Sequence, residues 1–181
     1  MNEYQKKFTE QIKTDSDKNW NKKREQLVNN YGWVIPTTQI IDVLSQPETI
    51  LEIGAGNGYL ASEVNKNGGS IYPTDMNVPD DTWTTVYPAT VQDIIENPSL
   101  APTTDVILSV WPPANSELAN RILSELSPSL FYYIGFIDGT ITGSSDMSTY
   151  LKEYQIQDQI PLEYTWTDKQ ESLYVFSQRN G

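Results

Sequence analysis

The chain has 181 residues, a formal charge of −12, and neither cysteine nor histidine. The lack of these two residue types excludes disulfides, thiolate catalysis, cysteine metal clusters and the commonest general base. Seven of the twelve basic residues precede Glu25, so the remaining chain is strongly acidic and disfavours general binding to phosphate backbones. The length suits one domain with a real core, and no apolar run resembles a signal peptide or a membrane span, so we expect a cytoplasmic protein without membrane contacts.

Residues 1–30 predict a helical extension that precedes a main domain over residues 31–181. Tyr4, Phe8 and Ile12 recur every four residues, which is typical of one face of a helix, and Asp15-Ser16-Asp17 is a candidate cap for a second helix. We expect this extension to pack on the body of the protein. A cover over the mouth of an acidic cleft is the alternative.

An aromatic segment, YGWVIP, follows at residues 31–36 and precedes a predicted helix over residues 37–44. Tyr31 and Trp33 flank a glycine, Pro36 interrupts the chain, and Thr37 or Thr38 would cap the helix. Aromatic residues between helices are either core residues or walls of a ligand site. The sequence favours neither interpretation of Tyr31 and Trp33.

The stretch that organises the chain is ILEIGAGNGYLASEVNKNGGSIYPTD, residues 50–75. A short apolar run at residues 50–53 predicts a buried parallel strand, followed by glycines at positions 54, 56 and 58, a helix over 59–66 and a second strand over 70–74. Glycines let the backbone turn sharply and come close to a ligand. Asp75 follows about 20 residues later, where nucleotide-binding folds place a ribose acceptor.

The neighbours of the glycines indicate the class of ligand. Tyr59 replaces the third glycine of the dinucleotide fingerprint, and Glu52, next to the loop, suits a ligand with positive charge. LEIGAGNG resembles the first motif of the Rossmann-like (class I) S-adenosylmethionine (SAM) methyltransferases, which reads acidic, any, Gly, any, Gly, any, Gly. The resemblance covers roughly residues 49–137 and implies a three-layer α/β fold, with a mostly parallel seven-stranded sheet and a C-terminal antiparallel hairpin. The alternative is that Glu52 caps a helix and Asp75 only ends a strand.

The resemblance implies SAM as the cofactor, with Glu52 and Asp75 orienting it and the loop amides approaching its methionine end. The family's acidic residue for the adenine amino group falls here near Thr90, so the resemblance supplies no carboxylate at this position. A short strand over 83–87 and a helix over 90–96 are predicted around this position. The implied cofactor-binding residues are Glu52, Gly54, Ala55, Gly56, Asn57, Gly58, Asp75, Met76 and Thr90.

A predicted strand over residues 105–110 leads into Trp111-Pro112-Pro113. This turn is similar to the Asp/Asn-Pro-Pro-aromatic motif of amino-methylating members, but Trp111 and Ala114 replace its polar and aromatic residues. The W-P-P form of poorly characterised members is the nearer resemblance. The alternative is that the two prolines only begin the helix predicted over 116–126. Further strands are predicted over 129–138, ending at Asp138, and in a hairpin over 154–166 and 172–178, after a short helix over 148–153.

These patterns predict a SAM-dependent methyltransferase that acts on a small planar or apolar molecule rather than on nucleic acid. Trp111 and Pro112 would wall the acceptor site, and Tyr31 or Asp138 would deprotonate or orient the acceptor. A non-catalytic methyltransferase-like protein that binds SAM or a partner is the first alternative. An NAD(P)-binding oxidoreductase is the second, although no Tyr-x-x-x-Lys pair accompanies the glycine loop. The sequence gives no oligomeric state.

Overall fold

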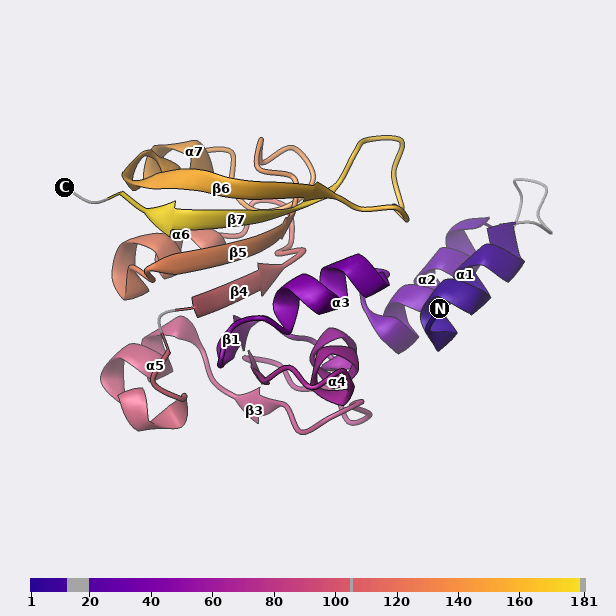
Figure 1. Cartoon of the computed structure of the whole chain (residues 1–181), viewed down its shortest axis with the longest axis horizontal. Coiled ribbons are helices and arrows are strands. Elements are labelled where there is room, and N and C mark those ends of the chain that lie inside the picture. The colour runs from indigo at the N-terminus through magenta and orange to yellow at the C-terminus, as the bar shows by residue number, and fades with distance from the viewer. Residues whose placement is uncertain (13–19, 105, 180–181) are drawn as a thin grey trace.

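A computed structural model of the chain describes residues 1–12, 20–104 and 106–179. One seven-stranded sheet organises it, with the strand order β3-β2-β1-β4-β5-β7-β6 (Figure 1). The strands are β1 (Ile50–Ile53), β2 (Ile71–Asp75), β3 (Tyr87–Pro88), β4 (Val106–Val110), β5 (Leu130–Gly135), β6 (Tyr154–Pro161) and β7 (Ser172–Gln178). Strands β1 to β5 pair in parallel, whereas β7 is antiparallel to both β5 and β6. The predicted fold class is confirmed.

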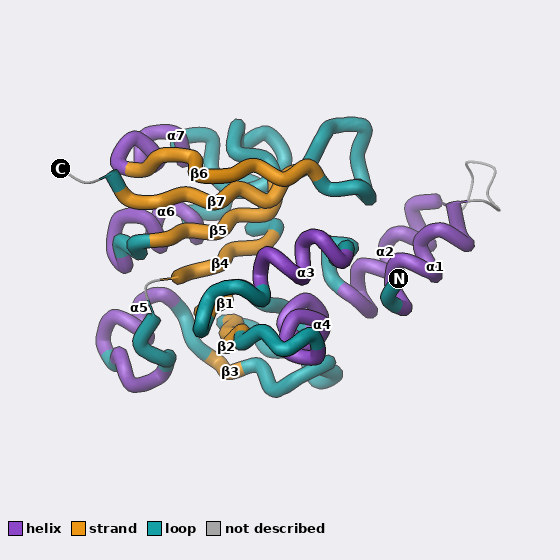
Figure 2. Tube along the Cα trace, viewed as in Figure 1, coloured by secondary structure: helices purple, strands orange, loops and turns teal. Residues whose placement is uncertain are grey.

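Helices lie on both faces of the sheet and beyond one end of it (Figure 2). The α-helices are α1 (Glu3–Ile12), α2 (Trp20–Tyr31), α3 (Thr38–Leu44), α4 (Tyr59–Lys66), α5 (Val91–Glu96), α6 (Leu118–Arg121) and α7 (Met147–Tyr150). Three short segments of other helix types are η1 (Pro98–Leu100), η2 (Ile122–Leu126) and η3 (Leu151–Glu153). The cap predicted at residues 15–17 lies outside the described residues.

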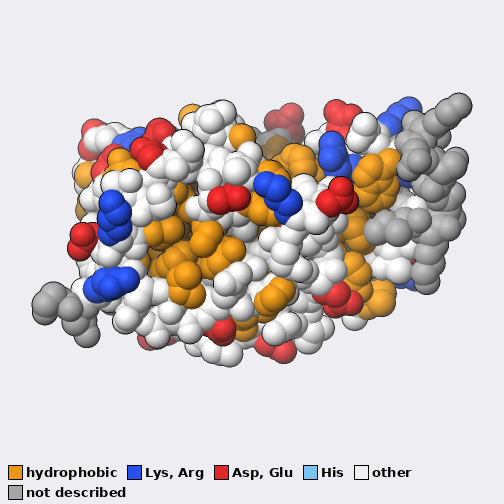
Figure 3. Space-filling view, turned by 90° about the horizontal axis from the view of Figure 1, so that it is seen from above, with side chains coloured by type: hydrophobic (Ala, Val, Ile, Leu, Met, Phe, Trp, Pro, Cys, Tyr) orange, Lys and Arg blue, Asp and Glu red, His pale blue; other side chains and the backbone are white. Residues whose placement is uncertain are grey.

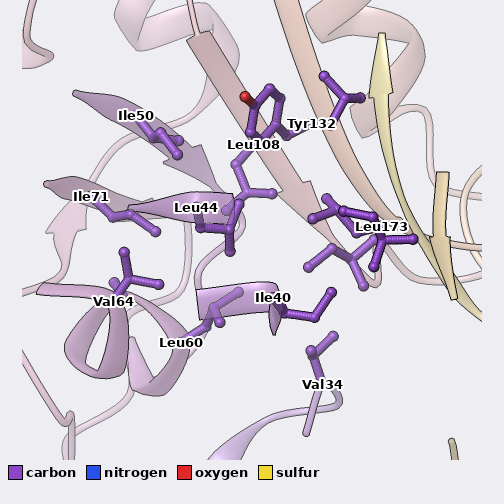
Figure 4. Close-up of a cluster of buried hydrophobic side chains, with 14 of the residues drawn as sticks. Val34, Ile40, Leu44, Ile50, Leu60, Val64, Ile71, Leu108, Tyr132 and Leu173 are labelled. Atoms are coloured by element: carbon purple, nitrogen blue, oxygen red, sulfur yellow. The ribbon is translucent and has the colours of Figure 1, made fainter. Parts of the chain in front are cut away.

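Two apolar layers hold these helices against the sheet. On one face, Ile40 and Leu44 of α3 and Leu60 of α4 pack with Leu108 and Leu173 of the strands (Figure 4). On the other face, residues of α5, α6, η2 and α7 pack against β1, β4, β5 and β7. Such burial is the main favourable term in folding, and both faces of a parallel sheet need it.

The first two helices pack beside the carboxyl ends of the parallel strands (Figure 1). Tyr4 and Phe8 of α1 are buried in an aromatic cluster that includes Tyr31 from α2 and Trp166 from the connection between β6 and β7. The rings of Tyr4 and Tyr31 stack with their centroids 4.7 Å apart. The aromatic residues of the extension thus form a core with the last part of the chain.

Several predicted elements differ from the structure. The strand predicted over 154–166 ends with β6 at Pro161, and the strand predicted over 129–138 ends with β5 at Gly135. The strand predicted over 83–87 is wrong for most of its length, because Trp83 donates its backbone N–H to Asn57 (2.9 Å) and its indole N–H to Asn30 (2.6 Å) instead of pairing with a strand. The helix predicted over 116–126 is α-helical only in α6 and continues as the π-helix η2. Ser127, with φ 46°, then ends it in the left-handed conformation.

The surface seen from above Figure 1 has an apolar area between charged side chains (Figure 3). Strand β6 is the sheet edge on this side, and its Ile156 has 52% of its surface exposed. The other side chains between Gln155 and Gln159 on β6 are polar and exposed. Polar and charged residues on an edge strand oppose pairing with another chain.

Candidate functional site

A cavity of about 540 Å³ opens where β1, β2 and β4 end. This volume lies within the range of roughly 300–1,000 Å³ that is usual for small-molecule sites, and the place is the edge where parallel α/β sheets bind ligands. Many of the predicted site residues line it. Its lining residues among those predicted are Tyr31, Glu52, Gly54, Ala55, Gly56, Asn57, Asp75, Met76, Thr90, Trp111 and Pro112.

The three glycines of the loop have different tasks. All have positive φ values, and a Cβ placed on Gly56 would meet no atom within 4 Å, because this position faces open space. A Cβ on Gly58 would lie 2.8 Å from Val86 and 3.0 Å from Thr84, and Gly58 does not line the cavity. Gly56 therefore keeps space free in the cavity, whereas Gly58 lets the loop before β3 pack closely.

The loop amides are engaged within the protein, which differs from the expectation that they face the ligand. Gly54 and Ala55 both donate to the carbonyl oxygen of Thr74, at 2.8 and 2.9 Å, and Gly58 donates to Ala55 at 3.0 Å. At the start of α4, the Tyr59 amide donates to the side chain of Asn57 at 3.2 Å. These short-range bonds shape the loop, so few N–H groups are left for an anionic ligand.

Asp75 ends β2 and closes the loop from the other side. Its Oδ2 accepts from the Gly56 amide at 2.8 Å, and its Oδ1 accepts from the Asn77 amide at 2.8 Å. Both oxygens thus have partners, yet the residue lines the cavity and is only partly buried. A carboxylate accepts more than one hydrogen bond per oxygen, so Asp75 can still accept from a ligand hydroxyl.

Glu52 is the most unusual group in the cavity wall. Only 2% of it is exposed, and among the described residues its Oε2 has no hydrogen-bond partner. Burial raises the pKa of Glu52 to about 8, and the neighbouring charge of Asp75 adds to the rise. A buried carboxyl without a partner is costly, and a cationic ligand would remove that cost. The reading of Glu52 as a helix cap is wrong, because it lies within β1.

The remaining predicted cofactor residues lie at the rim or hold local structure. Met76 is 69% exposed. Asn57 donates to the carbonyl oxygens of Asn29 and Asn30, at 3.3 and 2.9 Å, and so ties the loop to the end of α2. Thr90 lines the cavity, and it also caps α5 by exchanging hydrogen bonds with Asp93 in a capping box.

The other side of the cavity is aromatic. Trp111 follows β4 with φ 45°, and its indole stacks on Trp33 with ring centroids 4.7 Å apart and planes within 4°. Pro112 and Pro113 continue this wall, and the Pro112 carbonyl oxygen accepts from Gly143 at 3.0 Å. Trp33 is 40% exposed, so the stacked pair reaches from the buried wall to solvent.

Neither candidate for deprotonating an acceptor presents a free group to the cavity. The Tyr31 ring lines the cavity, but its hydroxyl donates to Glu3 at 2.9 Å and accepts from Lys7 at 2.6 Å, both on α1. Asp138 is exposed outside the lining, and its Oδ1 accepts from the amide and hydroxyl of Thr140 at 3.0 and 2.7 Å. These hydrogen bonds lower the pKa of Asp138.

Other lining residues carry no sequence signal of their own. Glu117 and Arg121 line the cavity one helical turn apart, and Arg121 pairs with Glu125 at 2.7 Å. The charged lining therefore consists of three carboxylates and one guanidinium that already has a partner, which favours a cationic ligand. Glu171, which contacts Trp111 from 60 residues away, was also not predicted.

Two further kinds of site are absent from residues 1–12, 20–104 and 106–179. No group of three or more Asp or Glu side chains there is placed to hold a metal ion. No helix in the same ranges is long and apolar enough to span a bilayer.

Comparison with known proteins gives structural neighbours only. No protein-family model and no curated protein sequence matches the chain. Among solved structures, magnesium protoporphyrin IX methyltransferase (ChlM) from Synechocystis PCC 6803 with bound SAM has a TM-score of 0.54 at 12% identity, over 93% of this chain and 88% of that chain.

Two further structures have the same fold. M. capricolum TrmK, in complex with the cofactor product S-adenosylhomocysteine, has a TM-score of 0.52 at 12% identity, over 78% of this chain and 67% of that chain. Burkholderia thailandensis 1,6-didemethyltoxoflavin-N1-methyltransferase, with bound 1,6-didemethyltoxoflavin and S-adenosylhomocysteine, has a TM-score of 0.54 at 9% identity, over 79% and 78%. At these identities the likeness establishes the Rossmann-like methyltransferase fold.

Proposed function

We propose that this protein binds SAM in the cavity and transfers its methyl group to a planar small molecule. The single observation that carries the proposal is the buried carboxyl of Glu52, whose Oε2 lacks a partner among the described residues. Such a group is stabilised by a ligand with positive charge. The structural neighbours that hold SAM or its product support the choice of cofactor.

The residues present fit this cofactor. Gly56 leaves open space beside the loop, and Asp75 offers a carboxylate to ribose hydroxyls. Bound SAM supplies a reactive methyl group on a positively charged sulfur. Glu52 and Asp75 would hold and orient the cofactor, and the acidic lining would favour its positive charge.

The loop geometry argues against a nicotinamide dinucleotide. A pyrophosphate is usually held by free amides of the glycine loop and the following helix. Here the amides of Gly54, Ala55, Gly56 and Gly58 all donate to protein oxygens. Two carboxylates, Glu52 and Asp75, would also repel the phosphates.

The stacked indoles of Trp33 and Trp111 support a planar acceptor. A flat wall at the cavity offers stacking to a ring rather than hydrogen bonds to an amine. Position and exclusion of water suffice for a displacement at a methyl carbon, so the lack of a free base at Tyr31 and Asp138 is compatible with activity. The same lack is what favours the second candidate, a SAM-binding protein without turnover.

Calorimetric titration with SAM, S-adenosylhomocysteine and NAD separates the ligand classes. We expect binding of the first two and none of NAD, and the reverse result would contradict the proposal. Transfer from labelled SAM is then assayed with flat heteroaromatic molecules and, separately, with tRNA. Label on tRNA alone would reject the small-molecule acceptor, and no transfer to any acceptor would favour the non-catalytic candidate.

Trp111→Ala tests the aromatic wall. We expect near-normal SAM affinity, because the cofactor residues lie on β1 and β2, and loss of methyl transfer. Trp20→Ala is the matched control, since it removes an indole from α2 outside the cavity lining. A loss of transfer equal in both variants would reject a specific role for Trp111.

A further inference from the structure

Trp111 is held in a conformation that its residue type rarely adopts. Its φ of 45° lies in the left-handed region, where a residue with a bulky side chain is strained. Its backbone amide donates to Ile134 at 2.9 Å, its ring stacks on Trp33, and its edge meets Phe136 at 5.9 Å between centroids. The single polar atom of its indole, Nε1, donates to Oε2 of Glu171 at 2.9 Å.

Glu171 lies just before β7 and completes a closed cycle of contacts with three tryptophans, Trp33, Trp111 and Trp166. Its Oε1 accepts from the Trp166 amide at 3.4 Å, and the Trp166 indole donates to the carbonyl oxygen of Trp33 at 2.8 Å. Glu171 is 1% exposed and makes no ion pair with any Lys or Arg that the structure describes. Two N–H donors thus surround a buried carboxyl.

The side chain of Glu171 is not required to hold the hairpin itself. Its main-chain carbonyl oxygen accepts from the Leu162 amide at 2.9 Å and from the Gln170 side chain at 2.8 Å. An apolar side chain would fill the same buried space without the cost of burying a carboxyl. The carboxyl therefore has a second task, which its hydrogen bond to Trp111 identifies.

We infer that Glu171 is a positioning residue that fixes the indole of Trp111, and through Trp166 the segment of Trp33, against the acceptor side of the cavity. The consequence for methyl transfer rests on the proposed function. The hold on Trp111 does not, because it consists of contacts within the chain.

Indole N–H resonances of the ligand-free protein test this inference directly. The chain has five tryptophans, and Trp111→Phe assigns the Trp111 signal by removing it from the ¹H–¹⁵N spectrum. In the wild type this signal should shift as Glu171 ionises, since burial raises the pKa of Glu171 to about 7. The pKa of the buried Tyr4 of α1 also responds to Glu171, but burial raises that pKa, so Tyr4 stays neutral in this range.

Three variants separate a positioning role from general packing. Glu171→Gln keeps an oxygen that accepts from Nε1, so the Trp111 signal should stay near its place and lose its pH titration. Glu171→Leu removes the acceptor, and the signals of Trp111 and Trp33 should both move. Glu163→Gln changes an exposed residue of the same connection between β6 and β7. It should leave the position and the pH titration of the Trp111 signal as in the wild type.

An unmoved Trp111 signal in folded Glu171→Leu would overturn the inference. If that variant does not fold, Glu171→Gln decides instead. A Trp111 signal that shifts with pH in Glu171→Gln as it does in the wild type would overturn the inference. None of these readouts involves SAM, so a failure of SAM to bind in calorimetry would count against the proposed function alone.

Discussion

Two buried glutamates of this protein, Glu52 in β1 and Glu171 just before β7, differ in what surrounds them. Glu52, on the glycine-loop side, lines the cavity and has an oxygen without a partner in the described part of the chain. Glu171, on the tryptophan side, lies behind the wall, and both of its oxygens accept hydrogen bonds from N–H groups. Burial raises the pKa of both, to about 8 and about 7.

The difference shows how the same residue type serves a ligand or the fold. A buried carboxyl whose partners are already present stabilises one arrangement of its neighbours. One that lacks a partner is an unfavourable feature of the free protein that a suitable ligand can reverse. Glu52 therefore indicates a ligand site, whereas Glu171 indicates a carboxyl that fixes the position of neighbouring side chains.

Filling the space beside Glu52 is the strongest way to test this contrast. Gly56→Val places a branched side chain in the open part of the cavity, so we expect SAM binding to fall below detection in calorimetry. Gly68→Val is the matched control: Gly68 also has a positive φ and open space around its missing Cβ, but it lies outside the lining. Equal losses of binding in both folded variants would mean that backbone strain, rather than blocked space, is responsible.

Exchanging each glutamate for glutamine compares them directly. Glu52→Gln should weaken SAM binding roughly 10- to 100-fold, because hydrogen bonds to charged groups contribute about 1.5–3 kcal/mol. It should also raise the free energy of unfolding at pH 8, because it removes a buried ionisable group. Glu171→Gln should leave SAM affinity unchanged. If calorimetry gave similar SAM affinities for the two variants, the proposed distinction between a ligand-binding and a structural glutamate would be wrong.

Asp75→Asn tests the second carboxylate on the ligand side. We expect a loss of SAM affinity of roughly tenfold, since charge-assisted hydrogen bonds are about twice as strong as neutral ones. Asp93→Asn is the control, because Asp93 is engaged in the capping box of α5 and does not line the cavity. An unchanged dissociation constant for Asp75→Asn would leave this residue with only its structural hydrogen bonds to Gly56 and Asn77.

The last test of the contrast is stability against pH. The folded state raises both glutamate pKa values above 4.5, so it binds these protons more tightly than the unfolded chain. Their contribution is therefore full below about pH 4.5 and is lost as the pH rises through about 7 for Glu171 and about 8 for Glu52. Urea unfolding should show decreasing stability over this range, with a smaller decrease in each glutamine variant. A flat or rising profile in the wild type would contradict these shifts.

The glycine-loop side was largely predictable because its residues lie close together in the sequence. Glu52, the glycines and Asp75 lie within one strand-loop-helix-strand unit, and hydrophobic runs of two strands frame them. The internal hydrogen bonds of the loop amides were not predictable, since they depend on where the Thr74 carbonyl oxygen and the Asp75 carboxylate come to lie.

The tryptophan side was predictable only in part. Two prolines after a strand mark a rigid turn, so Trp111 could be assigned to the cavity edge from the sequence. Glu171 is 60 residues from Trp111 and is flanked by polar residues, so nothing in its neighbourhood distinguishes it from an exposed glutamate. Likewise, the stack of Trp33 on Trp111 depends on long-range packing that no local pattern encodes.

The aromatic cluster of the N-terminal helices has a consequence for how the chain is made. Tyr4 and Phe8 are buried against Trp166, so the apolar face of α1 is covered only after the distant segment that contains Trp166 has been synthesised. At about 5–20 residues per second, synthesis from Phe8 to Trp166 takes roughly 8 to 32 seconds. During this interval, the surplus of positive charge on α2, from Lys22, Lys23 and Arg24 against Glu25, would help to keep the nascent chain from associating with others.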